Sequence, residues 1–194
     1  AKLWNHVQDF EFDAAQETGI SNKKGLKRKA FNVLFKLETW LLNRADINST
    51  ISYKMLDKLK EKSKSETFYF PNWIDPYKIN PDEYKVHKYL NSSVFKILYS
   101  GNIGNKQDWD FFLLFANKLK NYNVDIILVG DGAKREWLCE KIKCLDRIKY
   151  YPPVPYKELS SLLCSADLHV LFQKNDIIDS VMPSKLLGMM ASAK

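Results

Sequence analysis

The stretch Val124-Asp-Ile-Ile-Leu-Val-Gly-Asp-Gly132 decides the fold, because a mostly apolar run ends there in a turn with two glycines. A strand that is apolar on both faces is typical of a parallel sheet with helices on either side. Helical periodicity follows over residues 133–142. The stretch therefore predicts one strand, one turn and one helix of an α/β sheet.

The same strand–turn–helix order recurs on both sides of this stretch. Further strands are predicted at 95–99, 148–151 and 168–172, and further helices at 108–120, 156–165 and 184–192. Strict alternation with short loops predicts parallel strands and right-handed crossovers. Ligands of such sheets bind at the carboxyl ends of the strands. The expected ligand-binding loops are therefore 100–106, 130–134, 152–156 and 173–185.

The first part of the chain predicts a smaller set of elements. Strands are expected at 3–9, 47–52 and 66–70, and helices at 23–44 and 53–62, the second with Ser52 as its N-cap. Residues 71–81 then contain three prolines, which stop a helix and stiffen the backbone. A domain boundary is expected in this proline-containing stretch.

Composition indicates an ordinary soluble protein, with 45% hydrophobic and 27% charged residues among 194. No apolar run is long enough to span a membrane, and the first residues lack the features of a signal peptide. The three cysteines have no CxxC spacing, so buried free thiols are expected rather than zinc ligands. The net charge of +7 is concentrated in residues 23–29 and 54–64. These clusters could meet nucleic acid, anionic lipid or a phosphorylated ligand, or form a solvated surface.

Several motifs occur in a fixed order along the chain. They are Val7-Gln-Asp-Phe-Glu-Phe-Asp-Ala-Ala15, Phe70-Pro-Asn-Trp-Ile-Asp75, Ser100-Gly-Asn-Ile-Gly-Asn-Lys-Gln107, Val129-Gly-Asp-Gly132, Ala166-Asp-Leu-His-Val-Leu171 and Met182-Pro-Ser-Lys-Leu-Leu-Gly-Met-Met-Ala-Ser192. Together they resemble retaining GT-B glycosyltransferases of the family-four type. The resemblance is greatest to the bacterial branch that builds colanic acid, capsule and O-antigen.

This resemblance implies a GT-B-like, Rossmann-like parallel donor domain preceded by the end of an acceptor-side α/β domain. Residues 1–70 would be the C-terminal part of the acceptor domain, 71–92 the interdomain linker and 93–194 the donor domain. The rest of the acceptor domain and the last donor-domain elements would lie outside this sequence. On its own, such a chain is expected to be inactive.

The glycine turns are candidate donor-binding sites. Gly101 and Gly104 carry no Cβ and allow the backbone to approach a phosphate, and Lys106 would add positive charge beside it. The resemblance places Gly130, Asp131 and Gly132 near the nucleotide. Relatives often carry a basic residue where this chain has Asn102, which weakens the phosphate clamp. A plain strand–helix turn is the alternative reading of either loop.

Ser184 and Lys185 are the strongest candidates for chemistry. A serine at a helix start can bind phosphate oxygens, and a lysine can stabilise a leaving diphosphate as negative charge grows. An N-capping serine followed by an exposed lysine is the structural alternative. Relatives have two glutamates near this turn, at the positions of Ser180 and Gly188 here. Asp179 is the candidate replacement for the first acid.

Three other positions are taken from the resemblance. Val154 and Tyr156 would contact the nucleotide base, although Tyr156 could equally be a packing residue at a helix start. Asp9 would end an acceptor-domain strand and touch a sugar, or simply cap a turn. The apolar face of helix 23–44 could lie on an anionic membrane or belong to the core.

The resemblance implies an enzyme that transfers a sugar from a nucleoside diphosphate donor, UDP-linked by expectation, with retention of configuration. The acceptor would be a lipid-linked saccharide or polysaccharide, and the location cytoplasmic, at the inner face of the plasma membrane. No cofactor, metal or nucleic acid is expected. The alternative is a non-catalytic nucleotide-binding α/β module. A dehydrogenase is disfavoured because no GxGxxG motif follows a strand.

Overall fold

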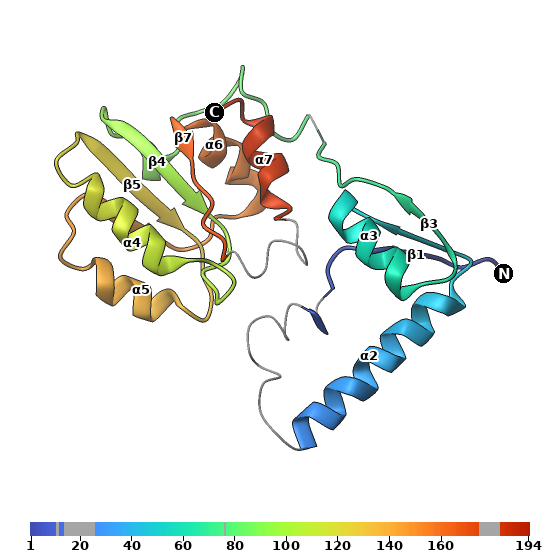
Figure 1. Cartoon of the computed structure of the whole chain (residues 1–194). Coiled ribbons are helices and arrows are strands. Elements are labelled where there is room, and N and C mark those ends of the chain that lie inside the picture. The colour runs from blue at the N-terminus through green and yellow to red at the C-terminus, as the bar shows by residue number, and fades with distance from the viewer. Residues whose placement is uncertain (11, 14–25, 76, 175–182) are drawn as a thin grey trace. The chain divides into compact units, whose positions relative to one another are not determined.

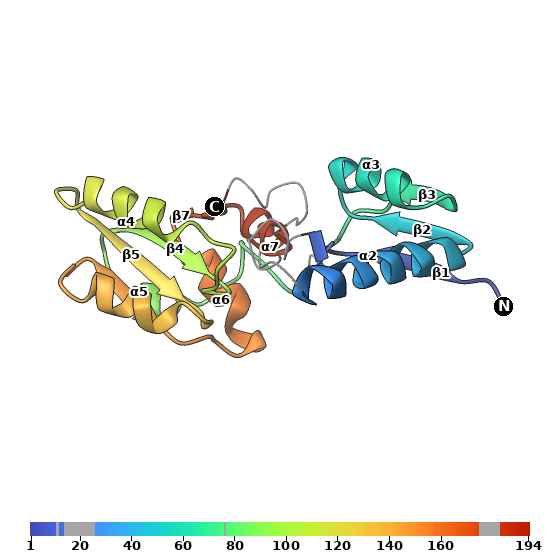
Figure 2. The same cartoon turned by 60° about the horizontal axis from the view of Figure 1, so that its bottom comes forward.

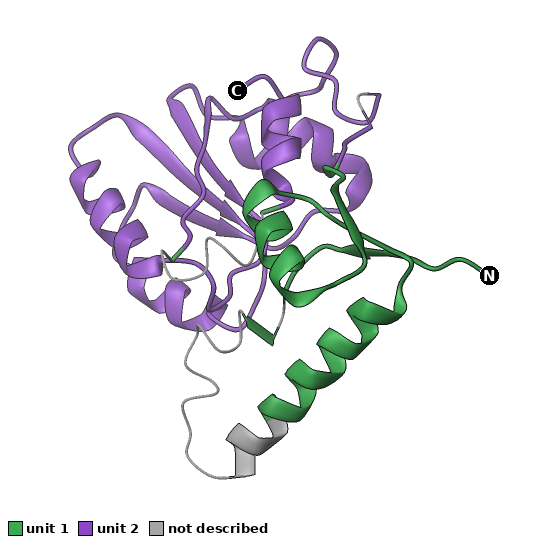
Figure 3. Cartoon of the chain, turned by 45° about the vertical axis from the view of Figure 1, so that its right-hand side comes forward, with its two compact units in different colours: residues 1–72, 174–183 green, residues 73–173, 184–194 purple. Residues whose placement is uncertain are grey.

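A computed structural model describes residues 1–10, 12–13, 26–75, 77–174 and 183–194 of the chain. The chain divides into two compact units (Figure 3). The first contains Ala1–Asn72 with Lys174–Pro183, and the second contains Trp73–Gln173 with Ser184–Lys194. This boundary lies in the proline-containing stretch. The roles assigned to residues 1–70, 71–92 and 93–194 stay predictions.

The first unit is built on a three-stranded parallel sheet with the order β1-β2-β3 (Figure 1). Its elements are β1 (Trp4–Val7), α2 (Leu26–Arg44), β2 (Ile47–Thr50), α3 (Tyr53–Lys62) and β3 (Glu66–Tyr69). The predicted cap of α3 is confirmed, since the Ser52 side chain accepts a hydrogen bond from the Met55 amide at 3.2 Å. The core of the unit gathers Phe10, Leu42, Ile51, Met55 and Leu59.

The second unit is a four-stranded parallel sheet with the order β6-β5-β4-β7. Its strands are β4 (Phe95–Ser100), β5 (Val124–Val129), β6 (Ile148–Tyr151) and β7 (Leu168–His169). Its helices are η1 (Lys88–Leu90), α4 (Trp109–Lys118), α5 (Arg135–Ile142), η2 (Tyr156–Glu158), α6 (Leu159–Cys164) and α7 (Lys185–Ala191). The predicted parallel α/β sheet is confirmed.

The core of the second unit has two parts, one on each face of its sheet. Tyr99 and Leu128 belong to the part that packs against α4 and α5, whereas Leu98 and Ile127 belong to the part that packs against α6. Figure 1 shows α4 and α5 on one side of the strands and α6 on the other, and Figure 2 shows α4 running alongside β4 and β5. The chain runs outward from β4 to β6 and returns to pair β7 with β4. The loops after β4 and β7 therefore flank the topological switch point, where such sheets bind ligands.

Two predicted elements differ from the structure. The strand expected at 168–172 pairs only over β7, because the chain then leaves the ladder and Phe172 packs on the rings of α4. The helix expected at 156–165 starts as the 3₁₀ turn η2 before α6. The expectation of three buried thiols is also wrong, since Cys164 is buried but Cys144 is exposed.

Candidate functional site

Lys185 is the first residue of α7, and its ammonium is drawn into the unit instead of pointing to solvent. Its Nζ lies 2.9 Å from the phenol oxygen of Tyr99 and 4.2 Å from the centroid of that ring. Burial lowers the pKa of Lys185 to about 8. A lysine held in this way keeps a positive charge at neutral pH in surroundings of reduced polarity, where its electrostatic effect on an anion is strengthened.

The two glycine turns after β4 and β5 interlock through their backbones. The Gly101 amide donates to Val129 O at 2.9 Å, and the Ile103 amide donates to Asp131 O at 2.8 Å. A Cβ at Gly130 would lie 1.9 Å from the Gly101 carbonyl oxygen, so only glycine allows this approach. Gly101 has φ +134° and lies beneath Lys185, whose Nζ would be 3.0 Å from a Cβ there.

A pocket of about 370 Å³ opens where these turns meet Lys185. Among the described residues it is lined by Ser100, Gly101, Asn102, Val129, Gly130, Asp131, Pro153, Val154, Leu159, Leu162 and Lys185. Six of the predicted site residues are thus brought together: Gly101, Asn102, Gly130, Asp131, Val154 and Lys185. One side of the pocket presents polar backbone groups and the Lys185 ammonium. The other side is an apolar wall formed by Val154, Leu159 and Leu162. Such a surface suits a ligand with an anionic end and a flat apolar end.

Other predicted residues lie outside this lining. Gly104 and Gly132 both flank the Asn102 side chain, and Lys106 is half-buried in the turn that follows Gly104. Tyr156 is 70% exposed and its ring faces the Lys78 ammonium at 5.8 Å.

At the last turn, Ser184 is exposed and its side chain makes no capping hydrogen bond, so the capping alternative is not observed. Asp179 falls outside the described residues.

Sequence reasoning missed Tyr99, Leu159 and Leu162. Tyr99 lies on the same face of β4 as Ile97 and reads as a core residue, which it is, yet its hydroxyl reaches the site. Leu159 and Leu162 read only as the apolar face of a helix. No local signal separates them from ordinary core residues.

The chain is similar to a named protein and to several solved structures. No family model matches the chain. It is 31% identical to a protein named as a colanic acid biosynthesis glycosyl transferase, WcaI of Escherichia coli K12, over 96% of this chain and 48% of the relative. The chain therefore spans about half the length of this curated relative.

Two solved structures have the same architecture. Anabaena HepE, solved with UDP and glucose, has a TM-score of 0.68 at 16% identity over 100% of this chain and 51% of HepE. WaaG, a glycosyltransferase involved in lipopolysaccharide biosynthesis, has a TM-score of 0.66 at 14% identity over 97% of this chain and 54% of WaaG. At these identities the structures establish the fold alone.

The chain has the fold of the GT-B glycosyltransferases. The predicted GT-B-like α/β fold is thereby confirmed. Its first unit has the parallel α/β build of that fold too, and carries Asp9 in a hollow of about 590 Å³ beside β1. Trp4, His6 and Glu38 also line this hollow.

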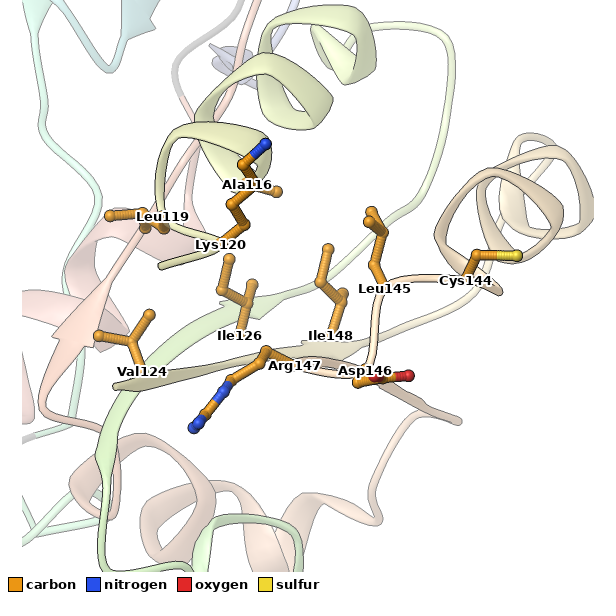
Figure 4. Close-up of a pocket in the computed structure, with 10 residues that line it drawn as sticks. All are labelled: Ala116, Leu119, Lys120, Val124, Ile126, Cys144, Leu145, Asp146, Arg147 and Ile148. Carbon is orange, nitrogen blue, oxygen red and sulfur yellow. The ribbon is translucent and has the colours of Figure 1, made fainter. Parts of the chain in front are cut away.

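Another cavity lies in the second unit, away from the glycine turns, at the amino ends of β5 and β6 (Figure 4). Its volume is about 300 Å³. Figure 4 shows side chains of Val124, Ile126 and Ile148 rising from the strands towards Ala116 of α4. No sequence feature predicted this cavity, and none of the predicted site residues lines it among those the structure describes.

Two features are absent from the described part of the chain. In those residues no group of three or more His, Cys, Asp or Glu side chains is placed to hold a metal ion. None of the helices there combines the length and the apolar character needed to cross a membrane.

Proposed function

We propose that this chain supplies the nucleotide-sugar site of a glycosyltransferase in bacterial cell-surface polysaccharide biosynthesis. The observation that carries the proposal is the ammonium of Lys185 above Gly101, in the pocket lined by both glycine turns. The relationship to WcaI and the fold of HepE and WaaG support it. The diphosphate would lie against Gly101, Gly130 and Lys185.

The proposed chemical role of the site is to stabilise the negative charge of the leaving diphosphate. Cleavage of the bond between the sugar and the diphosphate leaves negative charge on a phosphate oxygen, and a preorganised cation lowers that barrier. The glycine turns let backbone groups approach the phosphates without a Cβ in the way. Val154 and Leu159 offer an apolar wall on which the base of a UDP-linked donor would rest.

Finer details of the reaction are proposed from the resemblance of the sequence motifs. Transfer would be of a hexose with retention of configuration, to a lipid-linked saccharide or polysaccharide, with Asp9 on the acceptor side. No metal or cofactor takes part. The protein would work in the cytoplasm at the inner face of the plasma membrane. A half-exposed apolar stripe on α2 supports such a location.

The test is a thermal-shift titration of the chain with UDP, GDP and ADP, beside Lys185→Ala and the control Lys134→Ala. Lys134 lies in the neighbouring turn and is outside the lining of the pocket. We expect stabilisation by UDP in the wild type and in Lys134→Ala, and its loss in Lys185→Ala. Stabilisation that Lys185→Ala leaves unchanged would contradict this placement of the diphosphate.

Turnover is tested with the complete natural protein and a panel of UDP-sugars, measured as release of UDP in the presence of a polysaccharide or lipid-linked acceptor. Lys185→Ala should lower the rate by about 10²–10³. Binding of UDP with no turnover of any donor would instead indicate the alternative, a nucleotide-binding module without transferase activity.

A further inference from the structure

Tyr99 has an unusual position for a core tyrosine. It is fully buried and packs edge-on against Trp109, with ring centroids 5.0 Å apart. Burial raises the pKa of its phenol well above the usual value, so the group keeps its proton at every physiological pH. Tyr99 is therefore a permanently neutral partner for the groups around it.

The phenol joins the lysine to the first glycine turn. Tyr99 donates its hydroxyl proton to the carbonyl oxygen of Asn102 at 2.6 Å. Its oxygen lone pair faces the ammonium of Lys185 at 2.9 Å, so the lysine donates to the tyrosine. Because the two hydrogen bonds point in the same direction, each polarises and strengthens the other.

We propose that Tyr99 is a positioning residue, which fixes the Lys185 ammonium above Gly101 for the anionic end of the ligand without neutralising its charge. This inference rests on the proposed function, because the ligand is the donor diphosphate. It assigns a role to a residue that sequence analysis places in the core.

The chemical type of the partner carries the argument. A carboxylate would hold a buried lysine more strongly, but it would cancel the positive charge and repel a diphosphate. A neutral phenol and an aromatic ring hold the ammonium through a hydrogen bond and a cation–π contact, and leave its net charge available. Within the described residues, no carboxylate forms an ion pair with Lys185.

A purely structural role would not require the lysine. A buried phenol is satisfied by one acceptor, and Tyr99 already has the Asn102 carbonyl. Lys185 is stabilised more by the contact than Tyr99 is, because its ammonium loses hydrogen bonds to water on burial and the Tyr99 hydroxyl replaces one of them. Removing the hydroxyl should therefore lower the pKa of Lys185 further and leave the fold intact.

The matched control is Tyr150. Its hydroxyl donates to the carbonyl oxygen of Gly130 at 3.0 Å, so Tyr150→Phe also removes a bond from a phenol to a glycine turn. Tyr150 has no contact with Lys185 among the interactions of the described residues. Of the two variants, Tyr99→Phe alone also removes the hydroxyl that accepts a hydrogen bond from Lys185.

The experiment measures the Kd of UDP across a range of pH for wild type, Tyr99→Phe, Tyr150→Phe and Lys185→Ala. Each Kd is divided by that of wild type at the same pH, which cancels titration of UDP itself. In parallel, NMR of the lysine ¹³Cε signal gives the pKa of Lys185 in the free chain. If the pKa falls by about one unit in Tyr99→Phe, UDP binding weakens by about tenfold above pH 8 and little near pH 6.

The outcomes distinguish the positioning role of Tyr99 from the proposed function. A lower Lys185 pKa and alkaline-selective weakening in Tyr99→Phe, absent in Tyr150→Phe, would support the positioning role. An unchanged pKa and pH profile in Tyr99→Phe, with binding still dependent on Lys185, would overturn it and leave the proposed function standing. Equal weakening at every pH, or the same effect in both phenylalanine variants, would also overturn it. Absence of UDP binding in all proteins would reject the proposed function, and with it this role.

Discussion

Gly130 and Gly101 follow neighbouring strands and approach each other so closely that a side chain at Gly130 would have no room. A Cβ at Gly130 would lie 1.9 Å from the Gly101 carbonyl oxygen and 3.0 Å from its carbonyl carbon. The obstacle is backbone, which cannot turn aside as a side chain would. The close approach places both turns against one pocket.

Gly130→Ala should therefore lower the free energy of unfolding by about 3 kcal/mol, towards the upper end of the cost of overpacking. Chemical denaturation of the chain measures it. Gly104→Ala is the control, since a Cβ there would lie 2.9 Å from the end of the Asn102 side chain, which can move. Its cost should be below about 1 kcal/mol. Equal losses in the two variants would contradict the backbone argument.

Lys185→Met should stabilise the free chain while it abolishes nucleotide binding. Since burial lowers the pKa of Lys185 to about 8, the folded chain binds fewer protons than the unfolded chain above that pH. The free energy of unfolding therefore rises with pH from about 8 to the ordinary lysine pKa of about 10.4. At neutral pH the charged lysine is a cost, and methionine removes about 1–2 kcal/mol of it.

The measurement for Lys185→Met is the difference in melting temperature from wild type between neutral pH and about pH 10. The advantage of the variant should shrink as the pH rises, because the wild-type lysine loses its charge. Lys134→Met serves as the control, at a half-buried lysine of the neighbouring turn that lies outside the pocket lining, and should show no such trend. A variant that melts below wild type at neutral pH would argue that the lysine is not held at an energetic cost.

Asp9→Asn should separate the two halves of the proposed reaction. Asp9 lines the hollow of the first unit, whereas the donor pocket is formed in the second unit. In the complete protein we expect turnover to fall by about tenfold or more, with UDP affinity within about twofold of wild type. Asp57→Asn is the control, on an exposed carboxylate of α3. Unchanged turnover in Asp9→Asn would leave Asp9 as a turn residue.

The outer stripe of α2 predicts binding to anionic lipid. Val33, Leu37, Trp40 and Leu41 are each about half exposed, and the Arg44 guanidinium lies 5.2 Å from the Trp40 ring. Apolar and aromatic groups beside a cation suit the surface of an anionic bilayer. Leu37→Glu with Trp40→Glu should reduce cosedimentation with phosphatidylglycerol vesicles by about tenfold.

A matched pair controls for the added charge in that lipid experiment. Asn32→Glu with Thr39→Glu places the same two acids at exposed polar positions of α2. This pair should lose much less binding. Equal loss in both pairs, or binding to phosphatidylcholine vesicles that is as strong, would reject an apolar contact with anionic lipid.

The sequence predicted those parts of the site that arise from chain order. Lys185 and Gly101 follow adjacent strands of a parallel sheet, and topology brings the carboxyl ends of such strands to one edge. No three-dimensional detail is needed to place them near each other. The shift of Lys185 away from solvent was not predictable, because it depends on the open space above Gly101.

Tyr99 marks the limit of pattern reasoning. An aromatic residue in an alternating strand is assigned to the core, and its buried ring fulfils that expectation. The direction of its hydroxyl depends on the path of the chain through Asn102, which no local pattern specifies. Phe172 shows the same limit, since packing on α4 ended a strand that its sequence favoured. In both cases tertiary packing decided what local propensity left open.

The open edge of β1 has a practical consequence for work with the isolated chain. Among the described residues β1 is an edge strand of the first unit, and its first residue Trp4 and the preceding Leu3 are both more than half exposed. Unpaired strand edges are templates for addition of further strands from other molecules. Concentrated samples should accordingly self-associate along β1, and Leu3→Lys should reduce that self-association.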